Sequence, residues 1–131
     1  MQVETGEYKP GSVAACEMVA RKVSSNGKGP CARSLHSSQV FKNYFVVFGG
    51  RNDDIFGKNM NTVALNDLHM MDMQTNDWMT VAMFATEELP DSRWGHSLCA
   101  SNDQLLLLGG MNLNTYCESV VFDIIIDDQA I

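Results

Sequence analysis

Short apolar segments alternate with polar turns along this chain, and a glycine pair closes one of the longest of them. Tyr44–Phe48 is aromatic or aliphatic throughout, leads into Gly49-Gly50, and follows His36–Val40 after the polar pair Lys42-Asn43. Two short segments joined by a polar turn are typical of an antiparallel β-hairpin. The same order returns later in the chain as His96–Ala100, Leu105–Leu108 and Gly109-Gly110. The sequence therefore predicts two hairpins.

Further apolar segments predict more strands beyond each glycine pair. Leu68–Met73 is followed by the turn Gln74–Asp77 and by Trp78–Val81, and Ser119–Ile124 takes the corresponding third place after the second hairpin. Four short strands without a helical period predict an all-β fold of four-stranded antiparallel meanders. The continuously apolar second strands predict burial on both faces. Each glycine pair predicts positive φ or a close backbone approach, where a Cβ would clash.

A constant spacing of 60 residues relates the two hairpins. Pro30–Ser37 and Pro90–Ser97 share Pro, Arg, His and Ser at this spacing, which places Arg33 with Arg93 and His36 with His96. Beyond the glycines the spacing falls to 51, because the counterpart of Asp72 is Asp123. The first copy therefore carries a nine-residue insertion, within residues 51–64. Self-similarity of this kind is typical of repeat architectures.

These residues together resemble the kelch repeat, one blade of a β-propeller. The resemblance covers residues 30–123 and includes Leu65–Leu68 and Thr75–Trp78. The second copy departs from it, with Glu118 in place of Asp67 and Gln129 at the tryptophan position. The resemblance implies a structural role for the repeat residues Arg33, His36, Gly49, Gly50, Asp72, Trp78, Arg93, His96, Gly109, Gly110 and Asp123. The Arg and His are then expected to support the turn into the first strand.

The repeats divide the chain into three parts. We expect a first kelch repeat at residues 30–82, with its insertion at 51–64, and a second at 83–131 that lacks its fourth strand. Residues 1–29 form an N-terminal segment in which 12–20 match strand 4 of a preceding blade. A short helix at Cys16–Val19 fits that stretch equally well.

Two blades are fewer than the roughly four to eight that close a propeller, so we expect a partial propeller. Exposing about 500 Å² of apolar surface on each open end would cost on the order of 12 kcal/mol. Three arrangements would avoid this cost, and we give them in order of preference. The missing blades come from the rest of a longer chain, from self-association, or from an assembly that clamps the partial propeller.

The net charge and the lengths of the apolar runs exclude some classes of function. The formal net charge of -7 opposes phosphate attraction, so nucleic acid and anionic membrane surfaces are excluded as expected partners. No apolar run approaches the roughly 20 residues of a spanning helix, and the N-terminus has no apolar signal core. We expect a cytoplasmic protein, and members of the kelch family are also cytoskeletal or ciliary. The cysteines form no C-x-x-C pair and are expected to be reduced, buried thiols: Cys16, Cys31, Cys99 and Cys117.

Candidate catalytic and metal-binding residues favour a structural interpretation. His36 and His96 recur with their arginines at equivalent positions, whereas an active site seldom needs one constellation in every repeat. The methionines are expected to fill space between blades, not to bind a soft metal: Met70, Met71, Met73, Met79 and Met83. We therefore predict no enzyme activity, no metal and no cofactor. The alternative is part of an enzyme-type propeller, similar to the metal-dependent oxidases, whose catalytic residues lie outside this chain.

Binding to other proteins is the remaining function class, and the strand topology indicates which loops would form the binding surface. In a meander the connections from strand 2 to 3 and from strand 4 to the next strand 1 leave on one face, so Arg51–Ala64 and Ala82–Ser92 are predicted neighbours. An aromatic side chain among charges is typical of an interface hot spot with a polar rim, although a solvated loop has the same composition. The candidate partner-binding residues are Arg51, Asp53, Asp54, Phe56, Lys58, Glu87 and Glu88. Their acidic excess favours a basic partner, and the chain is predicted to be a protein-interaction scaffold.

Overall fold

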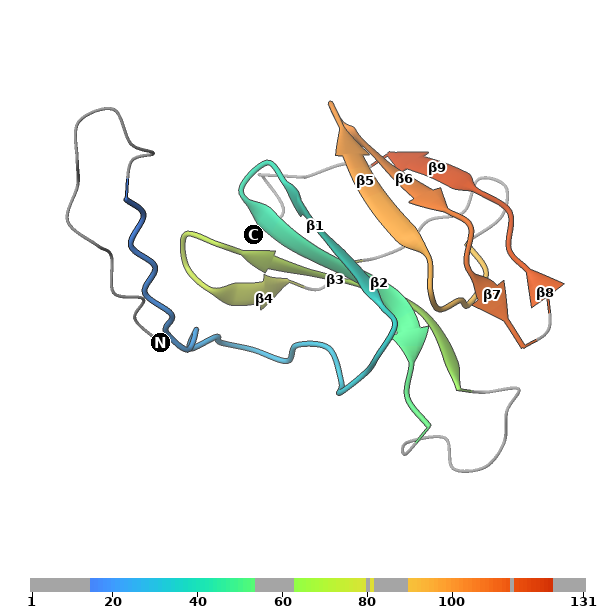
Figure 1. The fold of residues 1–131 in the computed structure, drawn as a ribbon, viewed down its shortest axis with the longest axis horizontal. Coiled ribbons are helices and arrows are strands. Elements are labelled where there is room, and N and C mark those ends of the chain that lie inside the picture. The colour runs from blue at the N-terminus through green and yellow to red at the C-terminus, as the bar shows by residue number, and fades with distance from the viewer. Residues whose placement is uncertain (1–14, 54–62, 80, 82–89, 114, 124–131) are drawn as a thin grey trace.

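The computed structural model describes residues 15–53, 63–79, 81, 90–113 and 115–123. Within these ranges the fold is all-β (Figure 1). The first sheet, which we call the first blade, has four antiparallel strands in the order β1-β2-β3-β4. Their bounds are β1 Ser37–Phe41, β2 Tyr44–Arg51, β3 Ala64–Asp72 and β4 Asp77–Met79. The predicted four-stranded meander is confirmed, with a third strand that begins earlier and a fourth that ends earlier than expected.

The second sheet, the second blade, contains three strands within the described residues. They are β5 Ser97–Ser101, β6 Gln104–Leu108 and β9 Val120–Asp123 in the order β5-β6-β9. Between β6 and β9 lies a small hairpin that the sequence pattern did not predict, made of β7 Met111–Asn112 and β8 Thr115–Tyr116. Both blades turn from their first to their second strand at equivalent positions, since Lys42 and Asn102 share φ 53°.

The core lies between the two blades. Residues on one face of the first blade interdigitate with residues of β5 and β6, and all are almost fully buried: Phe41, Val46, Phe48, Met70, Leu98, Leu105 and Leu107. Strand β2 is buried on both faces along Val46–Gly50, as its apolar sequence predicted. The same expectation is wrong for β6, where burial alternates. One face of β6 packs against the first blade, whereas Leu108 on its other face is 38% exposed.

The N-terminal segment runs beside β4 of the first blade (Figure 1). Asn26 forms a parallel bridge with Asp77, donates from its backbone N to Asn76 O (2.8 Å) and accepts from Trp78 N (2.9 Å). Gly29 lies against the Trp78 ring, where an added Cβ would meet Nε1 at 2.6 Å. Residues 15–29 contain no helix and no strand. The short helix at Cys16–Val19 is therefore not formed, and the assignment of residues 12–20 to a preceding blade stays a prediction, as do the domain boundaries.

Candidate functional site

Arg33 ties the turn before β1 to the glycine pair and to the start of β3. Its guanidinium donates to Gly49 O (3.1 Å) and to both carboxylate oxygens of Asp67 (2.6 and 2.9 Å), while Nε donates to Cys31 O (3.1 Å). The Arg33 side chain is 3% exposed. A buried guanidinium in a two-pronged ion pair holds three chain segments in fixed relation, because its donors form a rigid fork.

Asp67 is the acidic partner that keeps Arg33 neutralised. Burial alone would raise the pKa of this carboxyl. Hydrogen bonds from Arg33 and from His69 Nε2 (2.7 Å), together with their charges, outweigh burial and lower the Asp67 pKa from 3.8 to about 2. The paired carboxylate therefore stabilises the folded state more than the unfolded state.

A pH dependence follows from Asp67. Because its pKa is lower in the folded state, its contribution is complete above pH 3.8 and is lost as the pH falls toward about 2. The Asp67 side chain is 41% exposed, so solvent screening limits the contribution to roughly 1 kcal/mol. We expect Asp67→Asn to lower the free energy of unfolding by that amount at neutral pH and to flatten its decline between pH 4 and 2, as measured by urea denaturation.

Asp103 supplies the matched control, because it also pairs with a cation, Lys42 (2.9 Å), but its side chain is 76% exposed. Asp103→Asn is expected to leave both the stability and its acid profile close to those of the unchanged protein. An Asp67→Asn variant with an unaltered acid profile would show that the Arg33 pair contributes nothing to stability.

Arg93 takes the same place in the second blade, but it has a different set of partners. It donates from Nη1 to Gly109 O (2.9 Å) and to Glu118 O (2.6 Å), and from Nε to Asp91 O (3.1 Å). The residue is 1% exposed. Glu118 occupies the position of Asp67, yet it offers its backbone carbonyl where Asp67 offers its carboxylate. Among the described residues, no carboxylate forms an ion pair with Arg93.

The two repeated histidines lie in different surroundings. His96 is 7% exposed and donates from Nε2 to Phe48 O (2.9 Å) in the first blade, because a carbonyl oxygen only accepts. Burial, and then the nearby charge of Arg93, lower the pKa of His96. The ring therefore stays neutral at neutral pH and links the two blades. His36, in contrast, is exposed.

Both glycine pairs adopt the positive φ that the sequence indicated. Gly49 and Gly109 have φ 62°, while Gly50 and Gly110 have φ 97° and 96°. The close approach differs between the blades. A Cβ at Gly49 would meet Arg93 O at 2.9 Å, whereas a Cβ at Gly109 meets nothing within 4 Å among the described residues.

The remaining repeat residues occupy turns and sheet edges. Asp72 accepts from Asn43 Nδ2 (3.2 Å) and from Gln74 N (2.8 Å), and so closes the turn between β3 and β4. Asp123 is exposed at the end of β9. Trp78 packs edge-on against His69, with ring centroids 6.3 Å apart. The structural role of these repeat residues stays a prediction.

The start of the predicted loop at residues 51–64 lies beside Trp94, which follows the second predicted loop, so the proximity of the two loops stays a prediction. The Arg51 guanidinium lies 4.7 Å from the Trp94 ring centroid, and Arg51 Nη2 pairs with Asp53 (2.9 Å). The buried Asn52 side chain donates to Ala32 O. The cation-π contact joins Arg51 to Trp94, and the Asn52 hydrogen bond joins it to Ala32. Both pairs are far apart in sequence, so no local sequence pattern predicts them. Five candidate residues lie outside the described residues: Asp54, Phe56, Lys58, Glu87 and Glu88.

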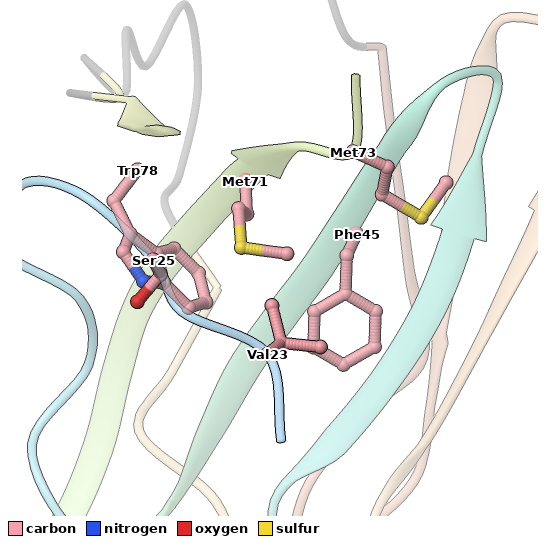
Figure 2. A pocket seen from close by; sticks show the side chains of 6 residues that line it. All are labelled: Val23, Ser25, Phe45, Met71, Met73 and Trp78. Carbon is pink, nitrogen blue, oxygen red and sulfur yellow. The ribbon is translucent and has the colours of Figure 1, made fainter. Parts of the chain in front are cut away.

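A pocket of about 430 Å³ lies between the N-terminal segment and the outer part of the first blade (Figure 2). Figure 2 shows Val23 and Ser25 facing Phe45, Met71 and Trp78 across it. Met73 completes the lining. The other methionines differ: Met70 is 4% exposed in the core, Met79 is 37% exposed, and Met83 lies outside the described residues.

The expectation that the cysteines are buried is wrong. All four are free, but Cys16 and Cys99 are exposed, and Cys31 and Cys117 are half-buried. The described residues include no group of three or more His, Cys, Asp or Glu side chains placed to hold a metal ion. They also include no helix long and apolar enough to cross a membrane.

Comparison with known proteins identifies the family. The model of the KLHDC2/KLHL20/DRC7 kelch-repeats domain matches residues 12–127. Human Kelch domain-containing protein 9 is 34% identical over 109 residues, which are 79% of this chain and 29% of that protein. Rat Kelch domain-containing protein 3 is 34% identical over 82 residues, 61% of this chain and 21% of the relative.

A third relative is the Dynein alpha chain, flagellar outer arm, of Chlamydomonas reinhardtii. It is 36% identical over 91 residues, 67% of this chain and 2% of the relative. The chain thus spans less than a third of the length of each of the three. The family match covers both blades, the glycine pairs and the repeated Arg and His. The chain belongs to the kelch-repeat family of β-propeller proteins.

Proposed function

We propose that this chain is a protein-interaction module whose partner binds the face formed by the β2–β3 connection and the connection that precedes β5. The observation that carries the proposal is the convergence of these connections. Gly50 N donates to Arg93 O (2.8 Å), Arg93 N donates to Leu65 O (3.1 Å), and Arg51 lies over Trp94 (4.7 Å). Loops positioned by a rigid sheet are where binding residues concentrate.

Charge supports a basic partner. Asp53 is exposed at the edge of this face, and Asp54, Glu87 and Glu88 belong to the same two connections. Because the whole chain carries a net charge of -7, a positively charged surface would be steered toward it. Phe56 is the aromatic anchor that the sequence offers among these charges. A basic, partly apolar protein surface is therefore the proposed ligand. A cytoskeletal partner belongs to the same proposal.

The enzyme alternative, an oxidase-like propeller completed by residues outside this chain, has no observation among the described residues in its favour. The non-enzymatic interpretation therefore remains the proposal.

Matched charge reversals test the binding face. Asp53 and Asp103 are both exposed and each pairs with one cation at 2.9 Å, but they lie at opposite ends of the sheets. We expect Asp53→Lys to weaken partner binding about tenfold at low ionic strength, with a smaller loss at high salt, because exposed charges act mainly through screened, long-range attraction. Asp103→Lys is expected to leave binding unchanged. Affinity is measured by titration against a partner captured with the full-length protein.

Phe56→Ala tests the anchor. If Phe56 is a hot spot, its truncation should cost about 2 kcal/mol, or roughly thirtyfold in affinity. Equal affinities for the unchanged protein, Asp53→Lys and Phe56→Ala, with folding intact by circular dichroism, would refute this face as the binding site.

A further inference from the structure

The turn before β5, residues 93–96, is held against the first blade by four hydrogen bonds. One of them comes from a side chain, since His96 Nε2 donates to Phe48 O (2.9 Å). The other three join backbone groups: Gly50 N to Arg93 O (2.8 Å), Arg93 N to Leu65 O (3.1 Å) and Gly95 N to Leu35 O (2.8 Å). The His96 ring therefore takes part directly in the contact between the two blades.

The His96 ring is enclosed by atoms of both blades. The Phe48 ring packs edge-on against it, with ring centroids 5.5 Å apart. A Cβ added at Gly49 would lie 3.0 Å from His96 Cε1, and one added at Gly110 would lie 2.9 Å from His96 Cβ. These contacts leave the residue 7% exposed, so its surroundings are set by residues that the structure describes.

The two nitrogens of the His96 ring differ in their partners. Because Phe48 O can only accept, Nε2 carries the hydrogen, and Nδ1 of the neutral ring has a lone pair. Nδ1 is buried without a hydrogen-bond partner among residues 15–53, 63–79, 81, 90–113 and 115–123. Ser37 Oγ, opposite Phe48 on β1, is buried and unpartnered in the same ranges, so these two atoms do not bond each other. A proton added at Nδ1 would therefore create a buried N–H without an acceptor, which is an unfavourable group inside a protein.

The charged groups that face the ring are basic. Arg93 lies in the same turn, and His36 lies in the turn before β1. Burial lowers the pKa of His96 most, the hydrogen bond to Phe48 raises it, and the charges of Arg93 and His36 lower it further. Strand β2 presents the Phe48 carbonyl, and Gly49 and Gly110 present backbone atoms alone. Within the described part of the chain, no acidic side chain compensates a positive charge on His96.

We propose that His96 is a pH-sensitive link between the two blades. The neutral ring holds the turn at residues 93–96 on the first blade through its Nε2–H bond to Phe48 O. Uptake of a proton from solvent at Nδ1 places a second positive charge beside Arg93 and a donor where no acceptor lies. Protonation therefore favours a conformation in which this turn has left the first blade. The proposal concerns the contact between the blades and not a partner, so it is independent of the proposed function.

The direction of the pH effect follows from the burial of His96. Because the pKa of His96 in the closed contact lies below its ordinary value of 6.5, the open form binds the proton more readily than the closed form. The contact is therefore at full strength above pH 6.5 and weakens as the pH falls below it. Asp67 acts in a separate range, since its contribution is lost between pH 3.8 and about 2.

A histidine NMR titration of the purified protein is the first test. We expect the His96 ring to carry its hydrogen on Nε2 and to remain mostly neutral at pH 6.5. His96→Gln identifies the signal by removing it. A hydrogen on Nδ1 of the neutral ring, or a pKa of 6.5 or higher, would overturn the proposal.

Hydrogen exchange of single amides measures the contact itself. The reporters are the amides of Gly50 and Gly95, which donate across the blades. The controls are the amides of Arg51 and Met111, which donate within their own blades to Ser34 O and Trp94 O (both 2.9 Å). After correction for the intrinsic rate at each pH, we expect the protection of the reporters to fall at least about threefold between pH 7.5 and 5.5, while that of the controls stays constant.

Two variants assign this effect to one ring. His96→Gln keeps a donor near Phe48 O but cannot titrate, so it should abolish the fall in protection. His69→Gln removes a histidine of β3 that bonds to Asp67, outside the contact between the blades, and should leave the fall unchanged. Constant protection in the unchanged protein, or an equal fall in His96→Gln, would refute the link. If His96→Gln does not fold, as judged by circular dichroism, the titration and the amide protection of the unchanged protein still decide, with the His96 signal then assigned by elimination from His36→Gln and His69→Gln.

Discussion

Gly49→Ala is expected to lower the free energy of unfolding by about 4 kcal/mol, because the new side chain adds backbone strain and a steric clash. A side chain at φ 62° costs roughly 1 to 2 kcal/mol, because Cβ crowds the following carbonyl. The new Cβ would also lie 2.9 Å from Arg93 O and 3.1 Å from Leu65 O, both backbone atoms, and overpacking of this kind costs about 1 to 3 kcal/mol. Urea denaturation at low protein concentration measures the sum.

Gly109→Ala separates the two contributions. Gly109 has the same φ and the same place in its repeat, but no described atom lies within 4 Å of its added Cβ. Its substitution should therefore show the backbone strain alone, about 1 to 2 kcal/mol. Equal losses for the two variants would mean that the contact of Gly49 with the second blade does not restrict that position.

The hairpins and the repeat were predictable because local patterns determine them. The apolar segments Tyr44–Phe48 and Leu105–Leu108, each closed by two glycines, indicate strands and their ends within about ten residues. The φ of 62° at Gly49 and Gly109 follows from the same pattern, since glycine is the residue that adopts it without strain. Fold class and family therefore followed from short-range information.

Contacts between blades were not predictable in the same way. The ring of His96 reaches Phe48 O, 48 residues away, and the Arg51 guanidinium lies over Trp94, so each pair forms only after both sheets are in place. The repeat suggested that the two histidines are equivalent, yet one is buried and the other is exposed. A single repeat carries no information about the residues that will lie beside it in the fold.

Side-chain burial was the least predictable property for the same reason. Cys99 and Leu106 are direct cross-strand partners on the outward face of the second blade, and Cys99 is exposed although cysteine is commonly buried. The small β7–β8 hairpin was missed because Met111–Tyr116 has no alternating pattern over its two-residue strands.

Arg93→Met is expected to cost about 3 kcal/mol, because it leaves three backbone carbonyls without their donor and each lost bond is worth roughly 1 kcal/mol. The acceptors are Gly109 O, Glu118 O and Asp91 O, and the arginine that serves them is 1% exposed. Methionine has a similar length and no donor, so it preserves much of the packing and removes the hydrogen bonds. Thermal and urea unfolding of the variant measure the loss.

Two further variants define what the guanidinium contributes. Arg93→Lys keeps the charge but cannot reproduce the fork of donors, so we expect it to recover less than half of the loss. Arg21→Met is the control at an exposed arginine and should change the stability by less than about 0.5 kcal/mol. If Arg93→Met costs no more than Arg21→Met, the repeated arginine does not hold the blade together. Full recovery by Arg93→Lys would show that charge, and not geometry, is what the position requires.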